Sequence, residues 1–191
     1  MTTPPIPAED ANSRLRDLLA QRPARLNEVL EFFDSLPPAA THELRGTWKG
    51  RELPTGNPLD GLLGLYGWHG KSFDDPEDAH PLVMDGRRGT FSLNPAMVPI
   101  NTVVRLHRLL KNPALGRLAR VLLPLFATKK PAARLRTIEY RGVPTATMVY
   151  DALPIHDHFR RIDRDTVLGA MDLRSLDSPF IFVLEREDAP R

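Results

Sequence analysis

The chain has 191 residues, of which 41% are hydrophobic and 26% are charged, with a formal net charge of +2 and no cysteine. This composition predicts a single globular domain over residues 1–191 with a substantial core. It excludes disulfides, thiol catalysis and cysteine-based zinc sites, and the small net charge gives no reason to expect a nucleic-acid partner.

Neither a secretion signal nor a membrane-spanning segment is expected. The first residues lack the basic and apolar regions of a signal peptide. The apolar run 121–127 is far shorter than the roughly 20 residues that span a bilayer. We therefore expect a cytoplasmic protein. We divide the domain into N-terminal helices (1–40), first strands (44–94), a helical insertion (95–133) and last strands (134–188).

Two helices are predicted at the start of the chain. The pair Asn12 and Ser13 is a candidate N-terminal cap for a helix that ends near residue 20. Pro23 suits the first turn of a second helix, in which apolar residues recur at helical spacing until Pro37. Because the second helix is amphipathic, we expect it to pack on the rest of the fold as a lid or plug.

Nine later segments have the composition and flanking turn signals of β-strands. They are 44–53, 62–73, 81–84, 89–93, 134–141, 145–151, 155–162, 166–173 and 179–187. Turns are predicted at the acidic segment 74–78 and across Asp85 and Gly86. Nine strands with many glycines favour a closed barrel, since closure removes the unpaired edges of a sheet. The predicted fold is mainly β, an antiparallel barrel of about 8–10 strands, and an open α+β sheet is the alternative.

The helical insertion at 95–133 is strongly basic. Asn101 and the pair Asn112-Pro113 are candidate helix starts. No acidic residue occurs between Asp85 and Glu139, whereas this window contains eleven basic residues: Arg87, Arg88, Arg105, Arg108, Lys111, Arg117, Arg120, Lys129, Lys130, Arg134 and Arg136. Basic amphipathic helices are typical of membrane-surface segments, and the asymmetry indicates an anionic partner. The alternative interpretation, which stays equally open, is that two ordinary helices cover the barrel and their arginines are solvated.

Several motifs carry a family resemblance. Gly-Thr-Trp-Lys-Gly at 46–50 and Trp-His-Gly-Lys-Ser-Phe at 68–73 resemble a bacterial family named for its Gly-x-Trp-x-Gly motif. Segments 146–151, 154–160 and 169–172 are similar to the domain of unknown function that usually follows this motif. The resemblance extends over roughly 44–186 and leaves out the insertion.

This resemblance implies a calycin-like barrel, the architecture of lipocalins and fatty-acid-binding proteins, with lipid binding as the expected role. It also implies that a tryptophan of the first strand packs at the closed end beneath a basic residue of the last strand. Trp48 and Arg186 are the matching positions in this chain.

The strand at 155–162 contains the side chains best suited to bind a metal or take part in catalysis. Alternation places His156 and His158 on one face and Asp157 on the other. The two histidines suggest a metal site completed by a further ligand from among His69, His80 and Asp172. A haem-binding barrel similar to nitrobindin is a related alternative. Histidines in solvent or in a hydrogen-bond network are the competing interpretation, and no metal or cofactor is predicted.

Asp157 is expected to lie inside the barrel. An ionised carboxylate in a low-dielectric interior must be paired, and Lys71 or Arg160 is the candidate partner. Such a pair either stabilises the fold or orients the polar group of a ligand. Other polar residues on neighbouring strands that could join it are Tyr150, Asp151 and Asp172.

The sequence contains no nucleophile elbow, phosphate loop or dinucleotide motif, and no aromatic residues alternate with the basic ones. We therefore predict neither an enzyme nor a nucleic-acid-binding protein. The predicted function is binding of an amphiphile, most simply a fatty acid or phospholipid, with its anionic head on the basic helices and peripheral contact with the inner face of the membrane.

Two alternatives remain open at this stage, a metal- or haem-binding protein or enzyme that uses His156, Asp157 and His158, and a regulatory protein-docking module. The candidate ligand-binding residues are Trp48, Trp68, Lys71, Arg105, Arg108, Lys111, Arg117, Arg120, Tyr150, Asp157 and His158.

Overall fold

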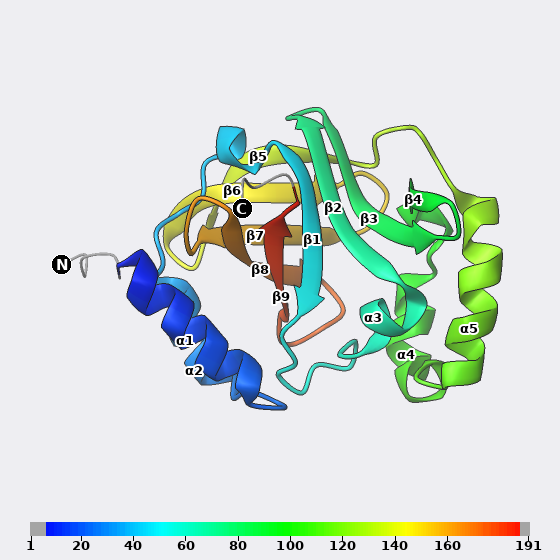
Figure 1. Cartoon of the computed structure of the whole chain (residues 1–191), viewed down its shortest axis with the longest axis horizontal. Coiled ribbons are helices and arrows are strands. Elements are labelled where there is room, and N and C mark those ends of the chain that lie inside the picture. Colours follow the sequence, from blue (N-terminus) through cyan, green and yellow to red (C-terminus); the bar gives the residue numbers. More distant parts are fainter. Residues whose placement is uncertain (1–6, 188–191) are drawn as a thin grey trace.

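The computed structural model describes residues 7–187. Its strands wrap around a central interior, with two helices on one side and a helical insertion on the other (Figure 1). The strands are β1 (Gly46–Glu52), β2 (Trp68–Asp75), β3 (Asp78–Gly86), β4 (Gly89–Ser92), β5 (Ala133–Tyr140), β6 (Val143–Tyr150), β7 (Ile155–Arg161), β8 (Thr166–Leu173) and β9 (Phe180–Arg186). The helices are α1 (Ala8–Ala20), α2 (Leu26–Ser35), η1 (Thr41–Leu44), α3 (Leu62–Tyr66), η2 (Pro95–Met97), α4 (Ile100–Leu110), α5 (Pro113–Leu122) and η3 (Leu123–Phe126).

Eight of the strands close into an antiparallel barrel. Around the ring the order is β1, β2, β3, β5, β6, β7, β8 and β9, and β4 extends β3 outside the ring. The junction between β3 and β5 is short, with a single register pair, Ala79 and Ala133. The predicted mainly-β barrel is therefore confirmed, and the alternative of an open α+β sheet is wrong.

Buried apolar residues form two separate cores, one inside the barrel and one outside it. The inner core includes Phe73 and Phe159. The outer core joins Leu18 and Phe33 of the N-terminal helices to residues of β8 and β9 such as Val183. Both β8 and β9 contain five consecutive buried residues, which requires cover on both faces of these strands. Helices α1 and α2 therefore cover the outer wall, and the predicted lid or plug is wrong.

One end of the barrel is closed as the family resemblance implies. Trp48 is fully buried, and its indole Nε1 donates to the carbonyl of Leu44 at 2.7 Å. The guanidinium carbon of Arg186 lies 4.2 Å from the centre of the Trp48 ring, and Arg186 Nε donates to Asp165 Oδ1 at 2.9 Å. A cation stacked on a tryptophan and held by a carboxylate stabilises this end.

The segment 62–66 is a helix and not the start of the second strand. Gly61 and Gly67 flank α3 with φ angles of +83° and +84°, which turn the chain into and out of one helical turn. The strand β2 consequently begins at Trp68. The following hairpin turns at Arg87 and Arg88, because Gly86 still pairs with the first residue of β4.

The predicted helix starts also need correction. Helix α1 begins at Ala8 after Pro7, and Asn12 inside it donates from Nδ2 to Asp163 Oδ2 at 2.8 Å instead of capping. Helix α2 begins at Leu26, three residues after Pro23.

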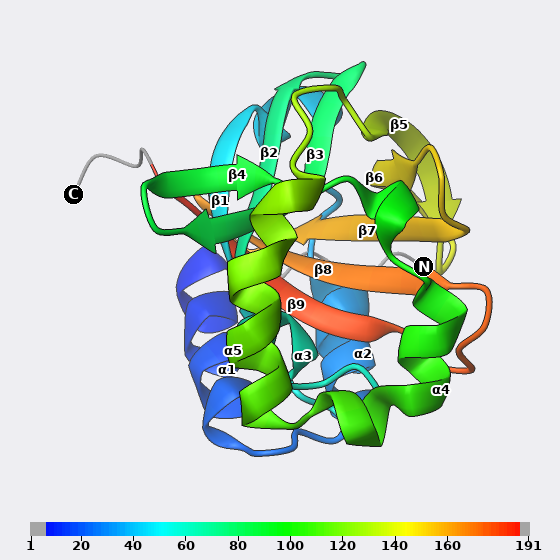
Figure 2. The same cartoon turned by 90° about the vertical axis from the view of Figure 1, so that its right-hand side faces the viewer.

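The insertion lies between β4 and β5, on the opposite side of the barrel from α1 and α2 (Figures 1 and 2). Asn112 caps α5 as predicted, since its side-chain oxygen accepts from the N–H of Ala114 at 2.8 Å. Helix α4 instead begins at Ile100 after Pro99, so Asn101 is not its cap. No helix within residues 7–187 combines the length and the apolar character needed to cross a bilayer.

Candidate functional site

The barrel interior contains a cavity of about 300 Å³ at the end covered by the insertion. Strands, α3 and α4 all contribute to its lining, which is mainly leucine, methionine and aromatic side chains. Residues that define its extent are Leu62, Tyr66, Trp68, Ile100, Val103 and Phe182. The side chains inside the barrel thus leave room for a small molecule.

Two charged side chains, Lys71 and Asp157, reach this apolar cavity. They form an ion pair, with 2.8 Å between Lys71 Nζ and Asp157 Oδ2. Lys71 Nζ also donates to Tyr150 Oη at 3.1 Å and to the carbonyl of Pro81 at 3.3 Å. The predicted partner of Asp157 is therefore Lys71, and Tyr150 completes the polar cluster. Of the other candidates, Asp151 pairs with an exposed arginine outside the barrel.

Burial controls the protonation of this cluster. Desolvation lowers the pKa of Lys71, and the adjacent carboxylate of Asp157 opposes that shift. Desolvation also raises the pKa of Tyr150 well above its ordinary value, and the negative charge of Asp157 adds to this effect. The phenol therefore keeps its proton at neutral pH and remains a hydrogen-bond donor.

One oxygen of the cluster has no partner among the described residues. Asp157 Oδ1 is buried and accepts no hydrogen bond, although its carboxylate lies in the cavity wall. A buried acceptor without a partner costs about 1–3 kcal/mol. A ligand that donates a hydrogen bond at this point would remove that cost.

A β-bulge brings Trp68 and Lys71 to the same side of β2. Strict alternation would place residues three apart on opposite faces. The pairing of β2 with β3 shifts register on both sides of Gly70. Only glycine fits there, because a Cβ atom would lie 1.9 Å from the carbonyl oxygen of Trp48. On the neighbouring strand, Gly50 leaves the space in which the Trp68 indole lies.

The predicted basic residues of the insertion lie outside the cavity. Arg120 donates to the carbonyls of Gly64 and Leu65 at 2.7 and 3.0 Å, which holds α5 against α3. The four others are exposed and absent from the cavity lining: Arg105, Arg108, Lys111 and Arg117. Trp48, at the closed end, is also absent from the lining.

His156, Asp157 and His158 do not form one site. His158 lies on the outer face of the barrel, where its ring stacks on Tyr140 with centroids 3.8 Å apart, and Tyr140 in turn contacts Phe33 of α2. His158 Nδ1 shares a hydrogen bond of 2.9 Å with Thr147 Oγ1. Burial, with smaller contributions from neighbouring cations, lowers the pKa of His158 to about 4, so the ring is neutral. Asp157 therefore lies apart from the two histidines, whose ring centroids are 6.1 Å apart, and the three side chains do not converge on one point.

The carboxylates of Asp74 and Asp78 approach the ring of His80 at the β2–β3 turn. Their ligand atoms lie within 4.8 Å of one another. Acidic groups on exposed turns are common without a bound ion, so this geometry alone does not define a metal site.

The closed eight-stranded barrel with its interior cavity places the protein among calycin-like barrels. Residues 31–89 match the family described as GXWXG protein, and residues 131–186 match the domain of unknown function DUF4334. A crystal structure of a protein from Thermomonospora curvata is similar, with 30% identity and a TM-score of 0.67, over 93% of this chain and 99% of that chain. The chain therefore belongs to the GXWXG family with the DUF4334 domain. No curated protein matches its sequence.

The sequence predicts the members of the polar cluster but not their arrangement. Asp157, Lys71 and Tyr150 were expected near a ligand, and the structure brings them together. From the insertion only basic side chains were expected at the ligand, whereas the apolar Ile100 and Val103 of α4 close the cavity. The signal in the sequence was that Ile100 and Val103 are apolar and three residues apart, which places them on one face of a helix.

Proposed function

We propose that the protein binds a small, mainly apolar molecule with one hydroxyl group inside the barrel. The observation that carries this proposal is an apolar cavity with a single polar cluster, in which Asp157 Oδ1 is without a partner. A hydroxyl group donates and accepts at once. It would donate to Asp157 Oδ1 and lie beside the phenol of Tyr150, whose oxygen already accepts from Lys71.

The size and charge of the cavity favour this ligand over the fatty acid or phospholipid expected from the sequence. A volume of about 300 Å³ lies at the lower end of the range for small-molecule sites, which is too small for a two-chain lipid. An anionic head next to Asp157 would bring two carboxylates together at low dielectric. The ion pair of Lys71 and Asp157 is neutral overall and favours a neutral polar group.

A first experiment identifies what the protein carries. Native mass spectrometry of freshly purified protein, with solvent extraction of the same sample, should yield a small neutral alcohol or phenol near one per chain. Recovery of a phospholipid or a fatty acid in its place would contradict the proposed ligand class.

A second experiment tests the chemistry of the site with matched probes. We expect 1-decanol to displace a fluorescent apolar probe from the barrel more strongly than its methyl ether or decanoate. The ether cannot donate to Asp157, and decanoate adds a negative charge. Equal displacement by all three would mean that the polar cluster does not recognise the ligand.

A pair of variants on α4 provides the control. Val103 lines the cavity, so Val103→Trp should fill it and abolish displacement by decanol. Thr102 is exposed on the same helix, and Thr102→Trp adds the same side chain outside the cavity. Equal binding by the two variants would place the ligand elsewhere on the molecule.

A further inference from the structure

The large exposed apolar side chains of the described residues gather on the insertion. They all lie between Met97 and Phe126, whereas the rest of residues 7–187 contributes none. Leu109 and Leu125 are the most exposed, at 66% and 78%. We call this surface the insertion face, and its apolar members are Met97, Leu106, Leu109, Leu115, Leu118, Val121, Leu122, Leu125 and Phe126.

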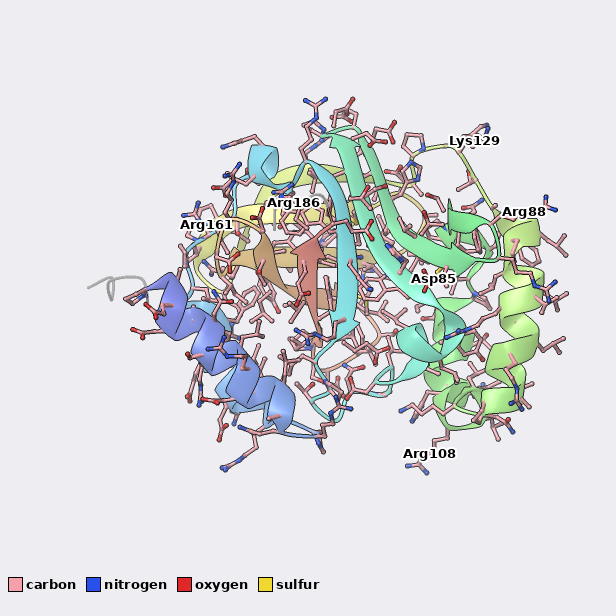
Figure 3. All side chains as sticks on the ribbon, viewed as in Figure 1. Asp85, Arg88, Arg108, Lys129, Arg161 and Arg186 are labelled. Carbon is pink, nitrogen blue, oxygen red and sulfur yellow. The ribbon has the colours of Figure 1, made fainter. Side chains whose placement is uncertain are left out.

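The same face is basic. The insertion has seven lysines and arginines and no acidic residue. Within the part of the chain that the structure describes, none of these seven forms a salt bridge, and Arg120 alone hydrogen-bonds through its side chain. Arg88, Arg108 and Lys129 project outward around the insertion (Figure 3).

We propose that the insertion face docks peripherally on an anionic phospholipid bilayer. Exposed leucines from α4, α5 and η3 would enter the boundary between headgroups and acyl chains. The arginines beside them would contact lipid phosphates, each with an attraction of ~1 kcal/mol. Long basic side chains keep their charge in the headgroup layer while their aliphatic parts remain among apolar groups.

Charge argues against a second copy of this chain as the occupant. A two-fold interface would place the insertion face of one protomer against the same surface of its partner. The basic residues of the two insertions would then face one another, and neither insertion contains an acidic residue as a counter-charge. A bilayer with anionic lipid supplies both the negative charge and the apolar layer.

The docking proposal does not depend on the occupant of the cavity, although both involve α4. Ile100 and Val103 face the cavity, whereas Leu106 and Leu109 of the same helix are exposed. Binding of vesicles and binding of decanol are therefore separable, and either can fail without the other.

Vesicle co-sedimentation tests the docking. The wild-type protein should bind phosphatidylcholine vesicles that contain about 30% phosphatidylglycerol, and bind poorly to phosphatidylcholine alone. The double variant Arg108→Ala/Arg117→Ala should bind about 30-fold more weakly. The double variant Leu118→Ser/Leu125→Ser should lose at least about tenfold, because it removes apolar burial and leaves the charge unchanged. Added salt should weaken the wild-type protein more than the arginine variant.

The matched control removes two exposed arginines elsewhere. Arg45 and Arg164 lie near the closed end of the barrel, and neither side chain forms a hydrogen bond or salt bridge within residues 7–187. Arg45→Ala/Arg164→Ala should bind vesicles like the wild-type protein. If both arginine variants lost the same affinity for vesicles, the loss would reflect net charge alone and the proposal would be overturned. The absence of vesicle binding would also overturn the proposal. A stable dimer in sedimentation that Leu118→Ser/Leu125→Ser dissociates would overturn it as well.

Discussion

At the scale of single residues, the ion pair of Lys71 and Asp157 is the central feature of the interior. Both side chains are almost fully buried, at 3% and 0% exposed. Their mutual attraction and the hydrogen bonds of Lys71 to Tyr150 and Pro81 offset the desolvation of the two charges. A pair of this kind rarely adds stability over apolar residues of the same volume.

The pair can be tested by removing one charge and then both. Lys71→Met leaves the carboxylate of Asp157 unpaired, and we expect the free energy of unfolding to fall by about 3–5 kcal/mol. In Lys71→Met/Asp157→Leu both charges are absent, so most of the stability should return, whereas decanol binding should stay lost. Urea denaturation at neutral pH measures the first effect. A double variant as unstable as the single one would contradict this account.

His158 should make stability depend on pH. Its pKa is about 4 in the folded protein against the ordinary value of 6.5 for a histidine in the unfolded chain, so the unfolded chain binds more protons between these values. The folded state therefore loses stability as pH falls through this window, by about 2 kcal/mol between pH 7 and pH 5.

The measurement is urea denaturation across that pH range, and two substitutions locate the effect. His158→Phe keeps an aromatic ring for the stack on Tyr140 and removes the titrating group, so its stability should decline less with acid. His156→Gln changes the exposed neighbouring histidine and should retain most of the wild-type slope. An unchanged slope in His158→Phe would assign the acid sensitivity to other groups.

At the scale of elements, α3 connects the barrel to the insertion. The carboxylate of Glu52 accepts from the N–H groups of Gly61 and Gly64 at the start of this short helix. Arg120 of α5 donates to the carbonyls of Gly64 and Leu65 near its end. These opposite charges complement the two ends of the helix. The insertion face is thereby held at a defined position relative to the cavity.

Gly116 of α5 provides a test of this contact. A Cβ atom at this position would lie 2.7 Å from Leu65 Cγ, so Gly116→Val should push α5 away from α3 at a cost of about 1–3 kcal/mol. Hydrogen exchange should accelerate in α3 and α5 and remain unchanged in β8 and β9. The control is Ala114→Val, which adds bulk at an exposed position of the same helix. Equal exchange in both variants would argue against tight packing at Gly116.

At the scale of the whole molecule, closure of the sheet separates the inner cavity from the outer core. The β3–β5 junction closes the ring with one register pair, supported by the bond from the N–H of Ala132 to the carbonyl of Ala79 at 3.1 Å. One end is sealed by Trp48 and Arg186, and the other is covered by the insertion (Figure 2). The cavity and the insertion face therefore lie on the same side of the molecule.

The sequence by itself determined the class of the fold, because strand composition, turn signals and glycines report local backbone preferences. It also determined that a carboxylate at position 157 would need a cation, because an unpaired charge cannot stay inside a barrel. The Trp48–Arg186 stack followed from the family resemblance, and the structure contains it.

Tertiary structure alone decided which candidates share a site. Trp68 and Lys71 face the cavity together because the pairing of β2 with β3 shifts register on both sides of Gly70. Such a shift belongs to two strands together, and alternation within one strand does not encode it. Likewise, α1 and α2 cover the outer wall because β8 and β9 are apolar on both faces. The arginines of the insertion lie outside the cavity because α4 turns Ile100 and Val103 towards it, while α5 packs on α3. These are long-range contacts that the local sequence does not encode.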